Sequence, residues 1–266
     1  MSHPKDVLEK LGASALRAFS QNFLHSESYA KRMVAPVLAE PFPDEYWEIG
    51  PGLGALTQHL LAQATRPVRL FEFDRKISNY LRAEYPETPL EEGDFLKTDL
   101  SLHTEKKIAI LSNLPYHISS QILLKILPIK SQILRCVFTF QKEYGEKLSA
   151  KPRTKEYGSL SILIQLNFEI ETLMILPASA FFPIPGVDSI VLLLTPKQDD
   201  GSLLKVEKLV RTAFAHRRKK LTSNLKAFSK DVNWEALLIQ MGFNSNTRAE
   251  ELAPLQYVEL FKLSQG

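Results

Sequence analysis

The fold is decided by the stretch Glu48-Ile49-Gly50-Pro51-Gly52-Leu53-Gly54-Ala55, where a short strand runs into a glycine-rich turn and then a helix. Glycines at such a turn let the backbone approach a ligand closely. The stretch also fits the loose glycine pattern of nucleotide-binding α/β folds. An acidic residue, Glu72, follows about twenty residues later, where such folds bind a ribose hydroxyl.

Strand and helix patterns alternate through the first two-thirds of the chain. Apolar runs predict strands at 46–49, 68–73, 108–112 and 133–140, with a short strand before Gly93, and helical periodicity predicts helices at 55–64 and 119–127. This alternation indicates a mostly parallel sheet covered on both faces, which binds ligands beyond the carboxyl ends of its strands. The glycine turn, Glu72, Asp94 and Asn113 each follow or end a strand, so we expect them at one edge.

Two features bear on the cofactor, because the glycine turn alone fits either NAD or S-adenosylmethionine. Pro51 removes an amide from a turn that would have to cradle a pyrophosphate, and S-adenosylmethionine has no phosphate. Asp94 ends the third strand, where it can accept a hydrogen bond from the exocyclic amine of adenine, with Phe95 near the ring. These features favour S-adenosylmethionine, held in part by Gly50, Gly52 and Glu72.

Asn113-Leu114-Pro115-Tyr116 follows the predicted strand at 108–112 and suits a planar base that carries an amine. The Asn113 side-chain oxygen and the Leu114 carbonyl can accept the two amine hydrogens, while the Tyr116 ring stacks on the base. Phe181 is a candidate for covering the opposite face of the base. For both rings the alternative is packing in the core.

Composition is that of a soluble globular protein, with 266 residues, 44% hydrophobic and 24% charged. No apolar run reaches the roughly 18–20 residues of a membrane span, and the start, Met1-Ser2-His3-Pro4, has no apolar secretory segment behind it. The single cysteine, Cys136, lies in a predicted strand and is read as a core thiol. Together these point to a cytoplasmic protein. The histidines lack partners at metal-ligand spacing, so no metal site is expected.

Basic residues concentrate in the C-terminal part, where Lys205–Lys230 contains nine Lys or Arg and one acid, Glu207. The segment 196–201 reads as a linker, and helical periodicity follows it. We therefore expect two domains, a Rossmann-like domain at 1–198 and a small helical RNA-binding domain at 199–266. The run 216–220 is expected on the outer face of a helix, where Arg217, Arg218, Lys219 and Lys220 are candidate phosphate contacts. A solvated surface without a ligand is the alternative.

A set of short motifs, taken together, resembles the KsgA-type ribosomal RNA small subunit methyltransferase A family. They occur in the family's order over nearly the whole chain from about Ser20, and each alone is weak. They are Gln21-Asn22-Phe23-Leu24, the 48–57 stretch, Gly93-Asp94-Phe95-Leu96, Asn113-Leu114-Pro115-Tyr116 with Ile118-Ser119-Ser120, Gln141-Lys142-Glu143, Tyr157-Gly158-Ser159-Leu160-Ser161, Phe181 with Pro183 and Pro185, Val187-Asp188-Ser189, and Ala213-Phe214 with Arg217-Arg218-Lys219.

The resemblance implies a class I methyltransferase fold and a methyl-donor site formed by Asn22, Leu24, Gly50, Glu72, Asp94 and Asn113. It also implies N6,N6-dimethylation of two adjacent adenosines in the 3′-terminal hairpin loop of 16S rRNA, within an immature small ribosomal subunit. We expect the protein to be a monomer. The chain departs from the family at Tyr144-Gly145 and at Gly186, which stands where a lysine is usual. These departures bear on RNA affinity rather than on the donor site.

Three other functions remain open from the sequence. One is a related adenine methyltransferase that acts on large-subunit RNA. Another is a ribosome-assembly factor that binds RNA without methylating it, against which the intact 113–116 motif argues. The last is an NAD-dependent oxidoreductase, which would bind nicotinamide and not S-adenosylmethionine.

Overall fold

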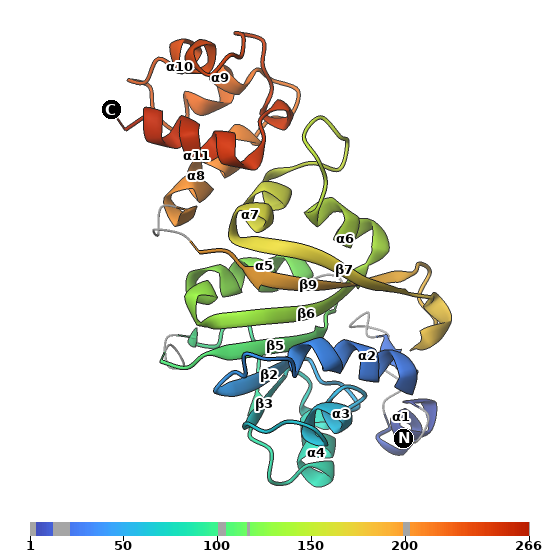
Figure 1. Cartoon of the computed structure of the whole chain (residues 1–266). Coiled ribbons are helices and arrows are strands. Elements are labelled where there is room, and N and C mark those ends of the chain that lie inside the picture. The colour runs from blue at the N-terminus through green and yellow to red at the C-terminus, as the bar shows by residue number, and fades with distance from the viewer. Residues whose placement is uncertain (1–3, 13–21, 101–104, 116–117, 199–202, 266) are drawn as a thin grey trace. The chain divides into compact units, whose positions relative to one another are not determined.

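The computed structural model describes residues 4–12, 22–100, 105–115, 118–198 and 203–265 (Figure 1). The chain divides into two compact units. The first comprises Met1–Gly145 and Glu169–Pro196, and the second comprises Glu146–Phe168 and Lys197–Gly266. None of the described helices is both long enough and apolar enough to cross a membrane.

A seven-stranded sheet, in the order β4-β3-β2-β5-β6-β9-β7, forms the centre of the first unit. Strands β2 to β6 pair in parallel, and β9 runs antiparallel to β6. The expected α/β fold with a mostly parallel sheet is therefore confirmed. The strands are β2 (Glu45–Ile49), β3 (Val68–Glu72), β4 (Leu90–Glu92), β5 (Ile108–Asn113), β6 (Ile133–Gln141), β7 (Phe168–Leu176) and β9 (Ser189–Pro196).

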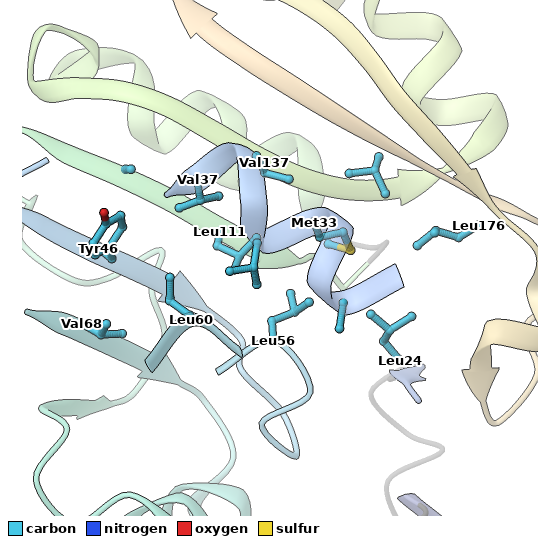
Figure 2. Close-up of a cluster of buried hydrophobic side chains, with 14 of the residues drawn as sticks. Leu24, Met33, Val37, Tyr46, Leu56, Leu60, Val68, Leu111, Val137 and Leu176 are labelled. Atoms are coloured by element: carbon cyan, nitrogen blue, oxygen red, sulfur yellow. The ribbon is translucent and has the colours of Figure 1, made fainter. Parts of the chain in front are cut away.

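Helices connect the strands of the first unit. They are α1 (Pro4–Lys10), α2 (Glu27–Val37), α3 (Thr57–Leu61), α4 (Arg75–Glu84) and α5 (Ser119–Ile126), with the 3₁₀ segments η3 (Leu127–Gln132) and η4 (Ala178–Ala180). Figure 2 shows the main core, in which Met33 and Val37 of α2 and Leu60 of α3 meet Leu111 and Val137 of the sheet. The residues of the central strands β2 and β5 are buried on both faces of the sheet, as expected for parallel strands covered by helices.

A small second sheet joins two segments that are far apart in sequence. Strand β1 (Phe23–Leu24) pairs antiparallel with β8 (Phe181–Phe182), with Phe23 opposite Phe182 and Leu24 opposite Phe181. This pairing holds the chain just after Asn22 against the first unit. The sequence does not predict this pairing, because two apolar residues carry no strand periodicity.

Helices predominate in the second unit. They are α7 (Ser159–Asn167), α8 (Leu203–Ala213), α9 (Leu221–Leu225), α10 (Trp234–Gln240), α11 (Pro254–Leu263) and η5 (Ala249–Glu251), while α6 (Lys142–Leu148) crosses the division between the units. The Phe214 ring lies between those of Tyr157 and Tyr257, with centroid distances of 6.4 and 6.3 Å. The boundary expected after residue 198 lies close to where the chain re-enters this unit, but the unit also takes in 146–168. The division into a Rossmann-like domain at 1–198 and a small helical RNA-binding domain at 199–266 stays a prediction.

The basic run 216–220 does not lie on a helix, so that expectation was wrong. Helix α8 ends at Ala213, and residues 214–219 form turns before α9. The Asn224 side-chain amide donates hydrogen bonds to the carbonyls of Ala213 and His216, at 2.6 and 3.1 Å. These bonds satisfy carbonyl groups that a continuing helix would otherwise pair, which stabilises the break.

Candidate cofactor and adenine site

Four neighbouring strand ends contribute to one cavity of about 390 Å³ in the first unit. Gly50 and Gly52 follow β2, Glu72 ends β3, Asp94 follows β4 and Asn113 ends β5, and all five line the cavity. The Ser112 hydroxyl donates to the Ile49 carbonyl, which joins the ends of β5 and β2. The sequence-based expectation that these residues gather at one edge is confirmed.

The glycine turn bends its backbone toward the cavity. Gly52 has a φ of 56°, a left-handed conformation that residues with a side chain rarely adopt, and a Cβ there would lie 3.2 Å from the Phe23 ring. Its N–H donates to Glu72 Oε2 at 3.2 Å. The close approach of turn, ring and carboxylate therefore depends on glycine at this position.

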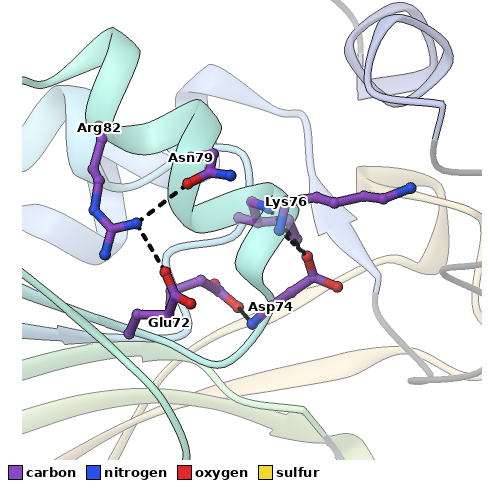
Figure 3. Close-up of polar contacts among 7 residues, drawn as sticks. Glu72, Asp74, Lys76, Asn79 and Arg82 are labelled. Atoms are coloured by element: carbon purple, nitrogen blue, oxygen red, sulfur yellow. Dashed lines mark hydrogen bonds and ion pairs between the residues drawn. The ribbon is translucent and has the colours of Figure 1, made fainter.

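Glu72 is held by main-chain donors on both oxygens. Besides Gly52 N–H, the Asp74 N–H donates to Glu72 Oε1 at 2.9 Å, and Asp74 in turn caps α4 by accepting from Lys76 N–H at 2.7 Å (Figure 3). Burial raises the pKa of Glu72, and the hydrogen bonds from Asp74 and Gly52 oppose that rise. The result is a rigid acceptor, fixed at the cavity wall, that suits vicinal ribose hydroxyls.

Asp94 presents one carboxylate oxygen to the cavity region. Its Oδ1 accepts from Leu96 N–H at 3.0 Å, and the side chain makes no other hydrogen bond with a described residue. Phe95 packs edge-on against Phe71, with ring centroids 5.1 Å apart, and both rings line the cavity. The remaining oxygen of Asp94 is thus suited to accept from an adenine amine.

Asn113 is bonded to the segment that precedes β1. Its Nδ2 donates to the Asn22 carbonyl at 2.9 Å, and Asn22, Leu24 and Leu114 also line the cavity. Because Nδ2 is engaged, the orientation of the amide is set and its oxygen is directed away from the Asn22 carbonyl. Tyr116, the expected stacking residue, lies outside the described residues.

Two cavity residues were missed by the sequence analysis. Glu48 is fully buried, its Oε2 has no hydrogen-bond partner among the described residues, and burial, together with the neighbouring Glu72, raises its pKa to about 8. Phe73 follows Glu72 and is 60% exposed although it is a large apolar side chain. An aromatic residue directly after a ribose-binding acid was a usable signal for Phe73. The burial of Glu48 depends on packing that the sequence does not reveal.

Phe181 does not border the cavity. Its side chain is 1% exposed and belongs to the main core cluster beside Leu24, its partner in the small sheet. The structure therefore gives the ring a packing role, and the expected contact with a target base is not supported by this placement. The pairing of β1 with β8 turns the ring inward, and the sequence does not show which way a two-residue strand faces.

The candidate phosphate contacts lie in the second unit. Arg218, Lys219 and Lys220 are exposed. Arg217 is also exposed but is engaged within the protein: its guanidinium donates to the Tyr157 carbonyl at 2.9 Å and pairs with Glu250 at 3.3 Å.

The cavity fits S-adenosylmethionine on several grounds. Glu72 is fixed for a ribose, and Asp94 has an oxygen suited to an amine. The glycine turn carries Pro51 at the wall and so has one donor fewer for a pyrophosphate. Fold and site together define a Rossmann-like methyltransferase that uses S-adenosylmethionine.

Comparisons with known proteins specify the family. The profile described as "Ribosomal RNA adenine dimethylase" matches residues 13–265. The chain is 36% identical to the "Ribosomal RNA small subunit methyltransferase A" of Francisella tularensis subsp. novicida, over 92% of this chain and 96% of that protein. This chain belongs to the ribosomal RNA adenine dimethylase family, and it is an enzyme of that activity.

Solved structures show the same fold. A dimethyladenosine transferase from Plasmodium falciparum superposes with a TM-score of 0.74 at 23% identity, covering 91% of this chain and 96% of that one. The 23S rRNA methyltransferase ErmE superposes with a TM-score of 0.67 at 26% identity, covering 92% and 100%. The Rossmann-like fold class expected from the sequence is thus confirmed.

Proposed function

We propose that this enzyme dimethylates N6 of two adjacent adenosines in the 3′-terminal hairpin loop of 16S rRNA, during late assembly of the small ribosomal subunit. The observation that carries the proposal is the 36% identity, over nearly the full length of both chains, to a protein named for the small subunit. The resemblance of the region with Phe181, Pro183 and Pro185 followed by Val187-Asp188-Ser189 supports it.

In this proposal each polar residue of the cavity has a defined task. Glu72 binds the ribose of the cofactor, Asp94 binds its adenine amine, and the glycine turn lies against its main chain. When bound, S-adenosylmethionine supplies an electrophilic methyl group on a sulfonium. Phe73 covers an apolar face of the cofactor, because its exposed ring lines the same cavity.

Asn113 and Leu114 hold the target amine. The N6 lone pair of adenine is delocalised into the ring and is a poor nucleophile. Two acceptors, Asn113 Oδ1 and the Leu114 carbonyl, would orient the lone pair and favour the positive charge that develops on nitrogen. The alkylated nitrogen is acidic and loses its proton to water or a carbonyl, so no strong base is required.

The target base has to leave its stack to reach this site. Tyr116 is the proposed stacking partner, and such stacking contributes roughly 1–3 kcal/mol per base. A second methylation requires that the pocket also admit N6-methyladenine. The RNA is held by phosphate contacts from Arg218, Lys219 and Lys220, and the enzyme acts as a monomer in the cytoplasm.

A second candidate substrate is large-subunit RNA. It is favoured by the superposition on ErmE, whose fold covers 92% of this chain. The identity to that protein, 26%, is lower than the 36% to the small-subunit relative. The small subunit is therefore the substrate that we propose.

The test is methyl transfer to isolated subunits from cells that lack this protein. We expect tritium from labelled S-adenosylmethionine to enter immature small subunits at two adjacent adenosines, located by mass spectrometry of 16S rRNA. Labelling of large subunits instead would establish the second candidate. Binding of small subunits with no transfer to either would leave an assembly factor that does not methylate.

A further inference from the structure

Two basic segments from distant parts of the chain lie together in the second unit. One is the basic loop, residues 151–157, which precedes α7, and the other is the basic turn, residues 214–220, between α8 and α9 (Figure 1). A third segment, the acidic turn at residues 248–251, contacts both. Arg153 N–H donates to the Glu250 carbonyl at 2.8 Å, and the Glu250 side chain pairs with Arg217 at 3.3 Å.

Arg217 joins the basic loop and the basic turn directly. The same guanidinium nitrogen that pairs with Glu250 donates to the Tyr157 carbonyl at 2.9 Å. Tyr157 is fully buried, and its hydroxyl donates to the Leu252 carbonyl at 2.8 Å, so the acceptor for Arg217 is fixed in place. Arg217 therefore connects three segments through a single guanidinium nitrogen, Nη2.

The remaining cations differ in their partners. Arg153 pairs with Glu251 at 3.3 Å, so its charge is matched within the protein. In the basic loop Lys151 and Lys155, and in the basic turn the residues from Arg218 to Lys220, have exposed side chains. Among the described residues these side chains have no hydrogen bond or ion pair. These two segments thus contain five exposed cations without partners in the described part of the chain, besides Arg153 and Arg217, whose charges are matched within the protein.

We propose that the RNA-binding surface extends to the basic loop, where Lys151 and Lys155 contact phosphates alongside Arg218, Lys219 and Lys220. Arg217 in this arrangement is a positioning residue that holds the two segments together, and it does not itself contact phosphate. The inference rests on the proposed function, because it concerns how the same enzyme holds its RNA.

Physical reasons favour this division of roles. An RNA backbone is bound by cations that displace its counterions, so only side chains free to meet phosphate contribute. A planar guanidinium suits Arg217 to its cross-link, because it donates in fixed directions to a carboxylate and a carbonyl at once. The acidic turn would repel RNA locally, and its charges are offset by Arg153 and Arg217.

The first experiment tests the basic loop. The double variant Lys151→Gln/Lys155→Gln is compared with Lys205→Gln/Lys262→Gln, which removes the same charge from the first turn of α8 and the last turn of α11. The probe is the small subunit from cells lacking this protein, with the dissociation constant measured against salt concentration. We expect the loop variant to bind about tenfold more weakly with a shallower salt dependence, as loss of about two phosphate contacts requires. Equal binding by the two double variants would overturn the extension of the surface.

The second experiment separates positioning from phosphate contact at Arg217. Glu250→Gln removes an acid and the ion-pair partner of Arg217, and leaves the hydrogen bond to the Tyr157 carbonyl. A phosphate-binding Arg217 would then bind RNA more tightly, whereas a positioning Arg217 loses its partner and binding weakens. Arg217→Lys keeps the charge but not the fixed donor geometry. We therefore expect both Arg217→Lys and Arg217→Gln to bind RNA more weakly than the parent, and with the same salt dependence as the parent. Parent-like binding by Arg217→Lys, or tighter binding by Glu250→Gln, would overturn the positioning role.

Methyl transfer by the parent enzyme is measured in the same preparations. Transfer to small subunits, together with variants that bind as the parent does, would refute this inference while the proposed function stands. Absence of both binding and transfer by the parent would refute the proposed function itself. Thermal unfolding midpoints of all variants show whether each is folded when it is assayed.

Discussion

The side-chain amide of Asn113 donates a 2.9 Å hydrogen bond to the main-chain carbonyl of Asn22. This bond links the end of β5 to the segment before β1, across 91 residues of sequence. It also sets the direction of the amide oxygen, the atom proposed to accept from the target amine. Asn113 is thus pre-oriented by the protein before a base arrives.

Glu72 is expected to determine cofactor affinity. Replacement by Gln keeps the shape but turns an N–H group toward one of the two main-chain donors, Gly52 or Asp74, that the carboxylate now satisfies. We expect the dissociation constant for S-adenosylmethionine to rise about 10- to 100-fold, the usual scale for hydrogen bonds to a charged group. Calorimetric titration measures it, with Glu84→Gln, an exposed acid on α4, as the control. Equal affinities of the two variants would argue against the ribose role.

Phe73 offers a separate test of the cofactor position. Because its side chain is 60% exposed, Phe73→Ala should change the unfolding midpoint little. If the ring covers the cofactor, affinity should weaken by about 1–3 kcal/mol, the usual range for stacking on an aromatic ring. Phe42→Ala, which removes a 46% exposed ring outside the cavity, is the matched control. Unchanged affinity in Phe73→Ala would place the cofactor elsewhere.

Phe181 should matter for stability more than for chemistry. Removing this buried ring in Phe181→Ala should cost about 3–5 kcal/mol of unfolding free energy. Phe181→Leu refills much of the space, so we expect it to recover most of the stability and of the methylation rate. A stably folded Phe181→Leu that methylates RNA more than tenfold more slowly would instead support the stacking role.

Glu48 should make stability depend on pH. Burial raises its pKa to about 8 in the folded protein, compared with an ordinary value of 4.5. Between pH 4.5 and pH 8 the unfolded chain releases a proton that Glu48 retains in the folded protein. The contribution of Glu48 to the free energy of unfolding is therefore complete below pH 4.5 and is lost as pH rises to 8. The slope approaches about 1.4 kcal/mol per pH unit. Urea denaturation without cofactor, from pH 5.5 to 8, should show this extra slope in the parent and not in Glu48→Gln. If the unfolding free energies of the two proteins changed with pH in parallel, the predicted contribution of Glu48 would be contradicted.

The sheet was predictable because central parallel strands such as β5 and β6 are buried on both faces and read as apolar runs between helices. The same pattern placed Glu72, Asp94 and Asn113 at one edge, since each ends or follows a strand. Short elements were not predictable. Strands β1 and β8 have two residues each, and the sequence does not show which side of such a strand faces the core, which decides the burial of Phe181. The basic run was misassigned to a helix because apolar spacing continues through Phe214 and Leu221, while the break depends on the contacts of Asn224.

In the proposed mechanism Asn113 orients the adenine amine for methyl transfer. The most direct measurement is the single-turnover rate of transfer by Asn113→Ala, with saturating cofactor and small subunits confirmed as bound, beside Asn79→Ala on α4. We expect the Asn113 variant to react about 100-fold more slowly or worse, the scale for loss of one oriented polar group, and the control to react as the parent does. A rate equal to the parent's in the fully loaded Asn113→Ala enzyme would contradict the claim.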